Sequence, residues 1–190
     1  MQHIAEGKRG IVYLCIHRGK KAVKKVEKEN NYAINIIQNE ISWLKKLNRY
    51  KIGPKIYSSR KNYFVCEYVD GERIIPYIEK SKKPLEIIKK ILKQCKTLDD
   101  LKVDKKEMNN PYKHIIVRKN QPIMIDFERA RFSLKPSNVT GFFSFLTAGK
   151  IMKILDKKGI ILDREKLKPL LQKYKKSYSD KYFRNLLRLI

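Results

Sequence analysis

The spacing of apolar residues changes along this chain, and that change limits the folds it can adopt. Residues 11–16 and 63–69 are rich in β-branched and aromatic side chains, which are typical of strands. Between them, residues 30–47 carry isoleucines and leucines at intervals of three or four, which predicts a helix. Helical spacing dominates after residue 74. The pattern therefore predicts an α+β fold with its strands concentrated at the N-terminal end.

Turn signals divide these segments further. A turn-like break at residues 17–20 separates strand 11–16 from a second strand around Val23, so we expect a hairpin there. The other elements predicted from spacing and breakers are a short helix at 74–79, a helix opened by Pro84, a hairpin of 115–117 with 123–125, and helices after 138 that break near Gly159 and resume at Asp163.

The length suits one domain or two small lobes around a shared core. Hydrophobic residues make up 42% of the 190 residues, enough for a packed interior. We predict a single domain over residues 1–190, with a β-rich lobe of about 1–68 that carries one helix. A mainly helical lobe of about 72–190 follows.

The net charge points to an acidic partner. Lys and Arg number 45 against 19 Asp and Glu, a formal charge of +26. This favours an anionic partner such as RNA or a ribosomal particle, and we expect no membrane partner, although a lysine-rich proteome gives the same count. No apolar stretch reaches the roughly 18 residues of a membrane span. The N-terminal segment lacks the apolar core of a signal peptide, so we expect a cytoplasmic protein.

Three cysteines and three histidines are spread along the chain. Cys15, Cys66 and Cys95 have no CxxC spacing and stand in apolar surroundings, so we expect reduced core residues.

A glycine pattern precedes the first predicted hairpin. Residues 5–12 follow G-x-G-x-x-G-x-V, with Ala5 at the first glycine and Gly7, Gly10 and Val12 at the later positions. Glycines between two strands let the backbone approach a phosphate, and an ordinary hairpin turn is the simpler alternative.

A lysine and a glutamate follow in order. Lys24 ends Ala22-Val23-Lys24 on the next strand, and Glu40 lies inside the predicted helix beside its apolar stripe. A carboxylate there could hold the lysine on the α- and β-phosphates of a nucleotide. Solvent exposure of both side chains is the alternative.

Two further segments complete the series. In the segment 66–71, an apolar–acidic–apolar run ends in a turn, and the backbone at Glu67 and Val69 is suited to an adenine edge. Asp126 follows a buried strand in Ile125-Asp126-Phe127-Glu128, where a carboxylate can ligate Mg²⁺.

This order of motifs resembles the protein-kinase-like superfamily over residues 5–130. The chain is similar to its atypical members: the RIO group, the small kinase of the tRNA threonylcarbamoyl-modification complex, and small archaeal predicted Ser/Thr protein kinases. The resemblance implies a bilobal kinase-like fold with an αC-type helix and a reduced helical lobe. It also implies ATP and Mg²⁺ as cofactors, with Mn²⁺ as a second metal.

The catalytic loop admits two registers. Counting back from strand 115–117 places His114 at the metal-binding asparagine and Asn109 at the base, which predicts an inactive enzyme. The second register, with a two-residue insertion, places Glu107 at the base, and we prefer it because it supplies a carboxylate. A nitrogen ligand at His114 would favour Mn²⁺ over Mg²⁺, unless His114 only hydrogen-bonds the loop.

We therefore expect an ATP-dependent phosphotransferase, an atypical serine/threonine protein kinase that phosphorylates itself or acts as an ATPase. Its catalytic residues would be Lys24, Glu107 and Asp126, and Asp126 and His114 would bind the metal. The alternative is a catalytically weak pseudokinase that serves as an RNA- or ribosome-associated binding module. The protein substrate is not identified by the sequence.

Overall fold

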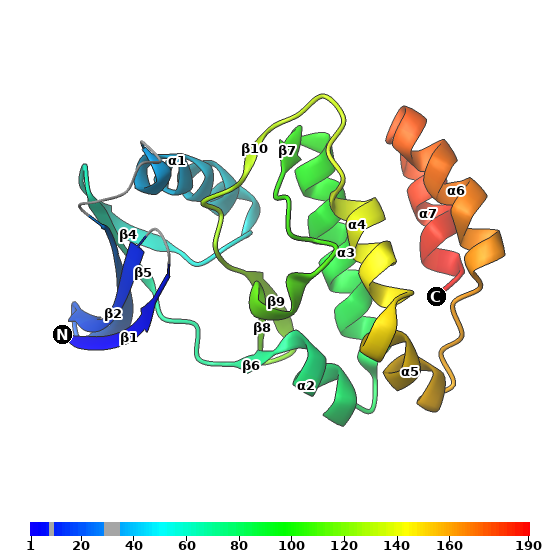
Figure 1. Cartoon of the computed structure of the whole chain (residues 1–190), viewed down its shortest axis with the longest axis horizontal. Helices are drawn as coiled ribbons and strands as arrows, with labels where there is room; N and C mark the ends of the chain where they lie inside the picture. The colour runs from blue at the N-terminus through cyan, green and yellow to red at the C-terminus, as the bar shows by residue number, and fades with distance from the viewer. Residues whose placement is uncertain (8–9, 29–34) are drawn as a thin grey trace. The chain divides into compact units, whose positions relative to one another are not determined.

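The computed structural model describes residues 1–7, 10–28 and 35–190, and the chain has an α+β fold (Figure 1). It divides into two compact units. Unit 1 comprises Met1–Asp70 and Ile123–Ala130, and unit 2 comprises Gly71–Pro122 and Arg131–Ile190. The α+β prediction is confirmed.

Unit 1 is built on an antiparallel sheet of five strands in the order β1-β2-β3-β5-β4. Its elements are β1 (Gln2–Glu6), β2 (Gly10–His17), β3 (Lys20–Glu27), α1 (Ile36–Leu47), the 3₁₀ helix Asn48–Tyr50, β4 (Ile56–Ser59) and β5 (Tyr63–Glu67).

The predicted hairpin is confirmed as β2 and β3. They pair from Gly10 opposite Glu27 to His17 opposite Lys20. The connecting Arg18 and Gly19 both have positive φ, 49° and 74°. A two-residue loop of this kind matches the right-handed twist of the strands.

Helix α1 buries the apolar stripe that the spacing predicted. Ile37, Ile41, Leu44 and Leu47 are all buried. The predicted start of this helix, residues 30–34, lies outside the described residues. Gly53 then permits a close approach, because it has a φ of +81° and a Cβ there would lie 2.7 Å from Cδ2 of Leu44.

Unit 2 is mainly helical. Its elements are β6 (Glu72–Arg73), α2 (Ile74–Lys80), α3 (Pro84–Asp100), β7 (Val103–Asp104), the 3₁₀ helix Pro111–Lys113, β8 (Ile115–Arg118), β10 (Arg131–Phe132), α4 (Asn138–Leu146), α5 (Gly149–Lys157), α6 (Arg164–Ser177) and α7 (Asp180–Arg188). Strand β9 (Gln121–Met124) leads from unit 2 into unit 1 and belongs to the sheet β6-β8-β9.

Three local signals in this half of the sequence are confirmed. Pro84 is the first residue of α3, and the turn between β8 and β9 uses positive φ at Lys119 and Asn120. Helix α6 begins after Asp163, whose side chain accepts hydrogen bonds from the N–H groups of Glu165 and Lys166.

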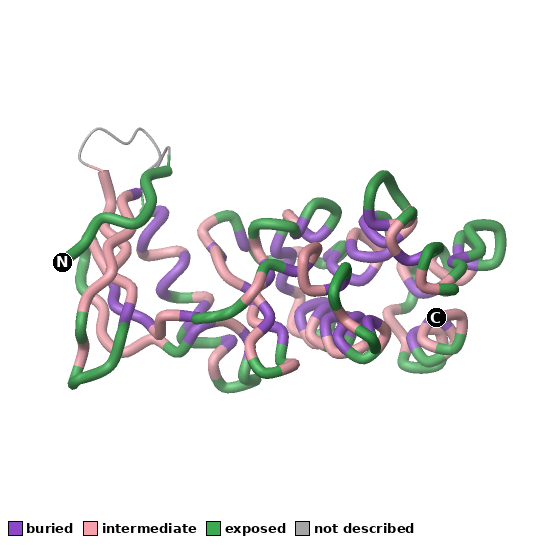
Figure 2. Tube along the Cα trace, turned by 90° about the horizontal axis from the view of Figure 1, so that it is seen from below, coloured by how far each residue is buried: buried purple, intermediate pink, exposed green. Residues whose placement is uncertain are grey.

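The core of unit 2 includes the buried residues of α3 and α4, and buried stretches of the chain are purple in Figure 2. The predicted apolar face of α3 is buried, namely Ile87, Ile88, Ile91, Leu92 and Cys95. All three cysteines are free thiols, and Cys66 and Cys95 are buried. Burial raises the pKa of Cys66 to about 12. Within the described part of the chain, no helix has the length and apolar character needed to cross a membrane.

A buried polar network organises the segments of unit 2 that surround the predicted catalytic loop. Asp99, on α3, accepts hydrogen bonds from the backbone N–H of Asn138 at 3.0 Å, from its Nδ2 at 2.7 Å, and from the hydroxyl of Tyr174 at 2.8 Å. Asn138 in turn accepts from the N–H of Lys105 at 3.0 Å through Oδ1. Burial raises the pKa of Asp99 despite these bonds.

This network predicts the effect of removing one hydroxyl. Tyr174 is fully buried, so Tyr174→Phe leaves a buried carboxylate short of a donor and should lower the free energy of unfolding by about 1–3 kcal/mol. Urea denaturation followed by circular dichroism measures this change.

Tyr178→Phe is the matched control. The Tyr178 hydroxyl donates to the carbonyl of Pro136 at 2.9 Å from a half-buried position, so its loss should cost less, roughly 0.5–1.5 kcal/mol. Equal costs for the two substitutions would contradict a central role for Asp99.

Candidate functional site

A cluster of four charged side chains in unit 1 is centred on Lys25. This residue lies on β3, in the middle of the sheet. Its Nζ is 2.7 Å from Oε2 of Glu40, 3.1 Å from Oε2 of Glu128 and 3.2 Å from Oδ1 of Asp126. One ammonium group therefore joins a strand, a helix and the turn that follows β9.

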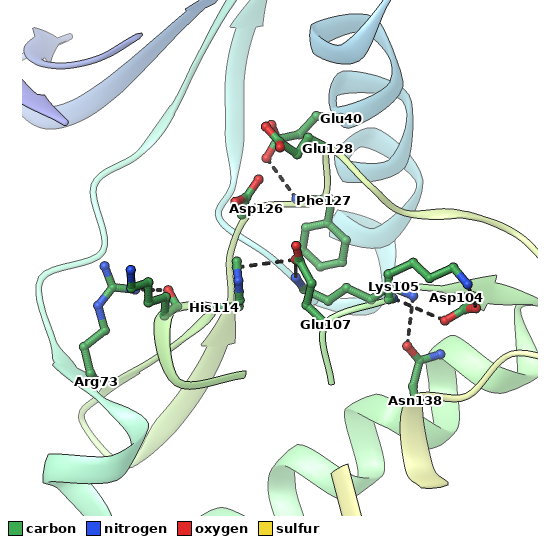
Figure 3. Close-up of polar contacts among 12 residues, drawn as sticks. Glu40, Arg73, Asp104, Lys105, Glu107, His114, Asp126, Phe127, Glu128 and Asn138 are labelled. Atoms are coloured by element: carbon green, nitrogen blue, oxygen red, sulfur yellow. Dashed lines mark hydrogen bonds and ion pairs between the residues drawn. The ribbon is translucent and has the colours of Figure 1, made fainter. Parts of the chain in front are cut away.

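Glu40 reaches both sides of this cluster because it is buried on the face of α1 that covers the sheet. Its side chain is only 4% exposed. While Oε2 contacts Lys25, Oε1 accepts a hydrogen bond of 3.0 Å from the backbone N–H of Phe127 (Figure 3). A buried carboxylate is stable only with such partners.

Asn39 is a second link between α1 and the turn. Its Nδ2 donates to the carbonyl oxygens of Glu128 and Ala130, both at 2.9 Å. Phe127 is fully buried, and Asp126 has a φ of 64°, in the left-handed region that aspartate adopts more readily than most residues. The turn 126–130 is thus held in one conformation by its backbone as well as by its charges.

The cluster shifts the ionisation of its members. Burial lowers the pKa of Lys25, but the three carboxylates outweigh it and raise that pKa above its usual range. Burial raises the pKa of Glu40, and the nearby lysine opposes this shift. Lys25 therefore stays charged at every physiological pH.

The prediction that Lys24 pairs with Glu40 is wrong, because Lys25 occupies that position. The Nζ of Lys24 lies 4.2 Å from the ring centroid of Tyr63 instead. Successive side chains of a strand point to opposite faces, so only one of two adjacent lysines can reach the helix. The segment Ala22-Val23-Lys24-Lys25 has two adjacent lysines, and the sequence motif alone does not show which of them faces the helix.

The predicted glycine loop begins where β1 ends. The N–H of Gly7 donates to the carbonyl of Gly10 at 2.9 Å, and Val12 lies on β2. A Cβ on Gly10 would lie 2.9 Å from the carbonyl oxygen of Val26, so close packing between strands already requires this glycine. Residues 8 and 9 of the loop lie outside the described part of the chain.

The predicted hinge residues follow β5. Glu67 ends the strand, and its N–H donates to the carbonyl of Lys55 at 2.8 Å. Val69 is buried, one residue before the end of the first segment of unit 1.

In unit 2 the predicted catalytic loop brings Glu107 to His114. Oε2 of Glu107 is 3.5 Å from Nδ1 of His114 and 3.7 Å from Nζ of Lys105, which is fully buried (Figure 3). The Glu107 side chain is 18% exposed. Asn109, the residue of the other register, is exposed.

The carboxylates around Lys25 have the composition of a metal site. Glu40, Asp126 and Glu128 can each offer one oxygen within 4.8 Å of the others. Carboxylate oxygens suit Mg²⁺, and three of them around one ammonium leave an excess of negative charge for a dication. Glu128 stands where a glycine is usual in the kinase motif, so the resemblance alone did not indicate its contribution.

The fold and the cluster define an α+β protein in which a buried lysine–glutamate pair lies beside the turn 126–130. No protein-family model matches the chain. It is 30% identical over 115 residues to the uncharacterized protein MJ1211 of Methanocaldococcus jannaschii, a match that covers 58% of this chain and 98% of that protein. The chain belongs to the same family as MJ1211.

The cluster predicts different effects for two adjacent lysines. Lys25→Met leaves three carboxylates without their cation in a largely buried site and should lower the free energy of unfolding by about 3–5 kcal/mol. Trp43, the one tryptophan of the chain, lies on α1, so its fluorescence during denaturation reports on unit 1.

Lys24→Met serves as the control, because it removes the same charge one residue away. It should cost about 1 kcal/mol or less, the usual size of a cation–π contact. A larger cost at Lys24 than at Lys25 would show that the cluster does not stabilise the sheet and helix.

Proposed function

We propose that this chain is an ATP-dependent phosphotransferase of the atypical protein-kinase-like class. The observation that carries the proposal is the contact of Lys25 with Glu40 beside Asp126. A lysine held by a helical glutamate, next to a carboxylate that follows a buried strand, is the arrangement that phosphoryl transfer uses to position a nucleotide. The proposal includes a bilobal kinase-like fold, with unit 1 as the nucleotide-binding lobe.

The residues of unit 1 are assigned to the nucleotide. Lys25 would donate to the α- and β-phosphate oxygens, with Glu40 fixing its ammonium group. The backbone at Gly7 and Gly10 would cover the phosphates. At Glu67 the adenine edge would meet the carbonyl oxygen, because the N–H already donates to Lys55.

The metal is assigned to the carboxylates of the same cluster. Asp126 and Glu128 would hold Mg²⁺, and Glu40 would remain with Lys25 and Phe127. The bound ion would neutralise charge on the phosphates during transfer. The turn that carries these two carboxylates is already held by the hydrogen bond from the N–H of Phe127 to Glu40 and by that from Asn39 to the main-chain carbonyl of Glu128.

Glu107 is assigned to the acceptor. Its carboxylate would take the proton of a serine or threonine hydroxyl as the hydroxyl oxygen bonds to the γ-phosphorus and ADP leaves. His114 and Lys105 contact this carboxylate and would orient it, and His114 could offer its other nitrogen to Mn²⁺.

Turnover of ATP tests the proposal. We expect ADP release by the wild type with Mg²⁺ or Mn²⁺, and a fall in kcat/KM of about 100-fold or more in Lys25→Ala and Asp126→Asn. Glu107→Gln should lower kcat by about 100-fold while nucleotide affinity is kept, because the substitution removes the base and leaves the phosphate contacts.

Lys24→Ala is the matched control and should retain turnover, since its ammonium group lies over Tyr63. Nucleotide binding without turnover under either metal would refute the enzyme and leave a nucleotide-binding pseudokinase. Equal loss in the Lys24 and Lys25 variants would refute the assignment of the ion pair to the phosphates.

A further inference from the structure

The three carboxylates that could hold a metal in unit 1 already share a cation, which belongs to the chain itself. Glu40, Asp126 and Glu128 each place one oxygen within 4.8 Å of the others, and they lie together in Figure 3. The Nζ of Lys25 contacts one oxygen of each, at 2.7, 3.2 and 3.1 Å. The ammonium group therefore uses the oxygens that a divalent cation would need.

A divalent cation and this ammonium group compete for those oxygens. Oδ1 of Asp126 and Oε2 of Glu128 are 3.2 and 3.1 Å from Nζ of Lys25. Because Mg²⁺ binds oxygen at about 2.1 Å, an ion on the same two atoms would lie no more than about 5 Å from Nζ. The Lys25 side chain is only 14% exposed, so water screens this repulsion poorly. Each cation therefore disfavours the other.

The lysine is the member of the cluster that can move. The turn 126–130 is held through its main chain, because Asn39 donates two hydrogen bonds to its carbonyl oxygens and the N–H of Phe127 donates to Glu40. Lys25 instead carries its charge on a flexible four-carbon stem. An exchange of cations would thus move the ammonium group and leave the carboxylates where they are.

Glu128 strengthens the hold of the cluster on Lys25. It adds a third carboxylate contact, at a position where the kinase motif usually has glycine. Its side chain is 17% exposed, so water competes little for this contact. A phosphate oxygen that recruits Lys25 must therefore displace one carboxylate more than it would in a chain with glycine at this position.

We propose that Lys25 closes this site in the absence of ligand by occupying the metal position, and that Glu128 is the residue that retains it there. A divalent cation gains the carboxylates only as Lys25 leaves them. Phosphate oxygens favour that departure, because they supply the anionic contacts that Lys25 loses. The competition between Lys25 and the metal needs no nucleotide, whereas the release of Lys25 by phosphates rests on the proposed function.

Binding of Mn²⁺ alone to the full chain tests the competition, with the electron paramagnetic resonance signal of free Mn²⁺ as the readout. Lys25→Met removes the competing charge and should tighten Mn²⁺ binding about 10-fold or more relative to the wild type. Lys24→Met is the matched control, since it removes the same charge from the adjacent residue, which lies over Tyr63. It should change the affinity less than about 3-fold.

Two results of this experiment would overturn the proposal. One is equal Mn²⁺ affinity in the wild type and Lys25→Met, and the other is an equal gain in both lysine variants. Because Lys25→Met is destabilising, circular dichroism is recorded with and without the metal. Bound Mn²⁺ replaces the missing ammonium group and should raise the urea midpoint of Lys25→Met more than that of the wild type. A Lys25→Met chain that stays unfolded in saturating Mn²⁺ would also overturn the proposal.

Glu128→Gln tests the retaining contact in a chain that keeps Lys25 paired with Glu40 and Asp126. Calorimetry with ATP in EDTA should show binding about 5-fold tighter than in the wild type or more, because the phosphates displace one carboxylate fewer. Glu27→Gln is the matched control, because it makes the same charge change on the strand of Lys25. It should change the affinity less than about 2-fold. Equal affinities in the two glutamate variants would refute the role of Glu128.

The Mn²⁺ and ATP measurements separate this proposal from the proposed enzyme. Tighter Mn²⁺ binding by Lys25→Met, together with no ATP binding by any form of the chain, would refute the phosphotransferase and uphold the competition. Turnover of ATP by the wild type, together with equal Mn²⁺ affinity in the wild type and Lys25→Met, would refute only the competition.

Discussion

The contact between Lys25 and Glu40 is the interaction on which unit 1 depends. Removing two charges from water is costly, and the pair is stable because each partner has further contacts: Lys25 with Asp126 and Glu128, and Glu40 with the N–H of Phe127. These contacts fix three separate segments, β3, α1 and the turn 126–130, in one arrangement. In the proposed phosphotransferase, the nucleotide and its metal would use these same charges, so a substitution in the cluster would affect stability and chemistry together.

In unit 2, too, a buried carboxylate on a helix holds a distant loop. Asp99, like Glu40, is a buried carboxylate on a helix that accepts a backbone N–H from a distant segment, in this case that of Asn138. Asn138 then holds the N–H of Lys105, two residues before Glu107. In both units a helix thus positions a loop through hydrogen bonds to its main chain. Such bonds fix the loop through its main chain, whichever side chains it carries.

Elements with a strong local signal could be predicted from the sequence. The hairpins carry left-handed turn residues, and α3 and α6 carry a proline and a capping aspartate at their first turns. The two-residue strands β6, β7 and β10 have no period to detect. Glu40 and Asp126 could be located from motif order, but Lys25 could not be separated from Lys24 without knowing which face of β3 the helix covers. Asn39, Glu128 and the Asp99 network depend on contacts between residues 33 to 103 positions apart, which no local pattern encodes.

The net charge of +26 can now be compared with the number of acidic residues that the two buried sites use. Few acidic residues are available, 19 in all, and four of them are used in the Lys25 cluster and at Asp99. Elsewhere the cations far outnumber the remaining acidic residues, and a positive field of this kind favours polyanions in general. A long-range field cannot distinguish one polyanion from another, because it acts through charge alone and is screened within about 10 Å at 0.1 M salt. Any selectivity among anions must therefore come from short-range features, such as the oriented carboxylates that would hold the metal of the proposed nucleotide.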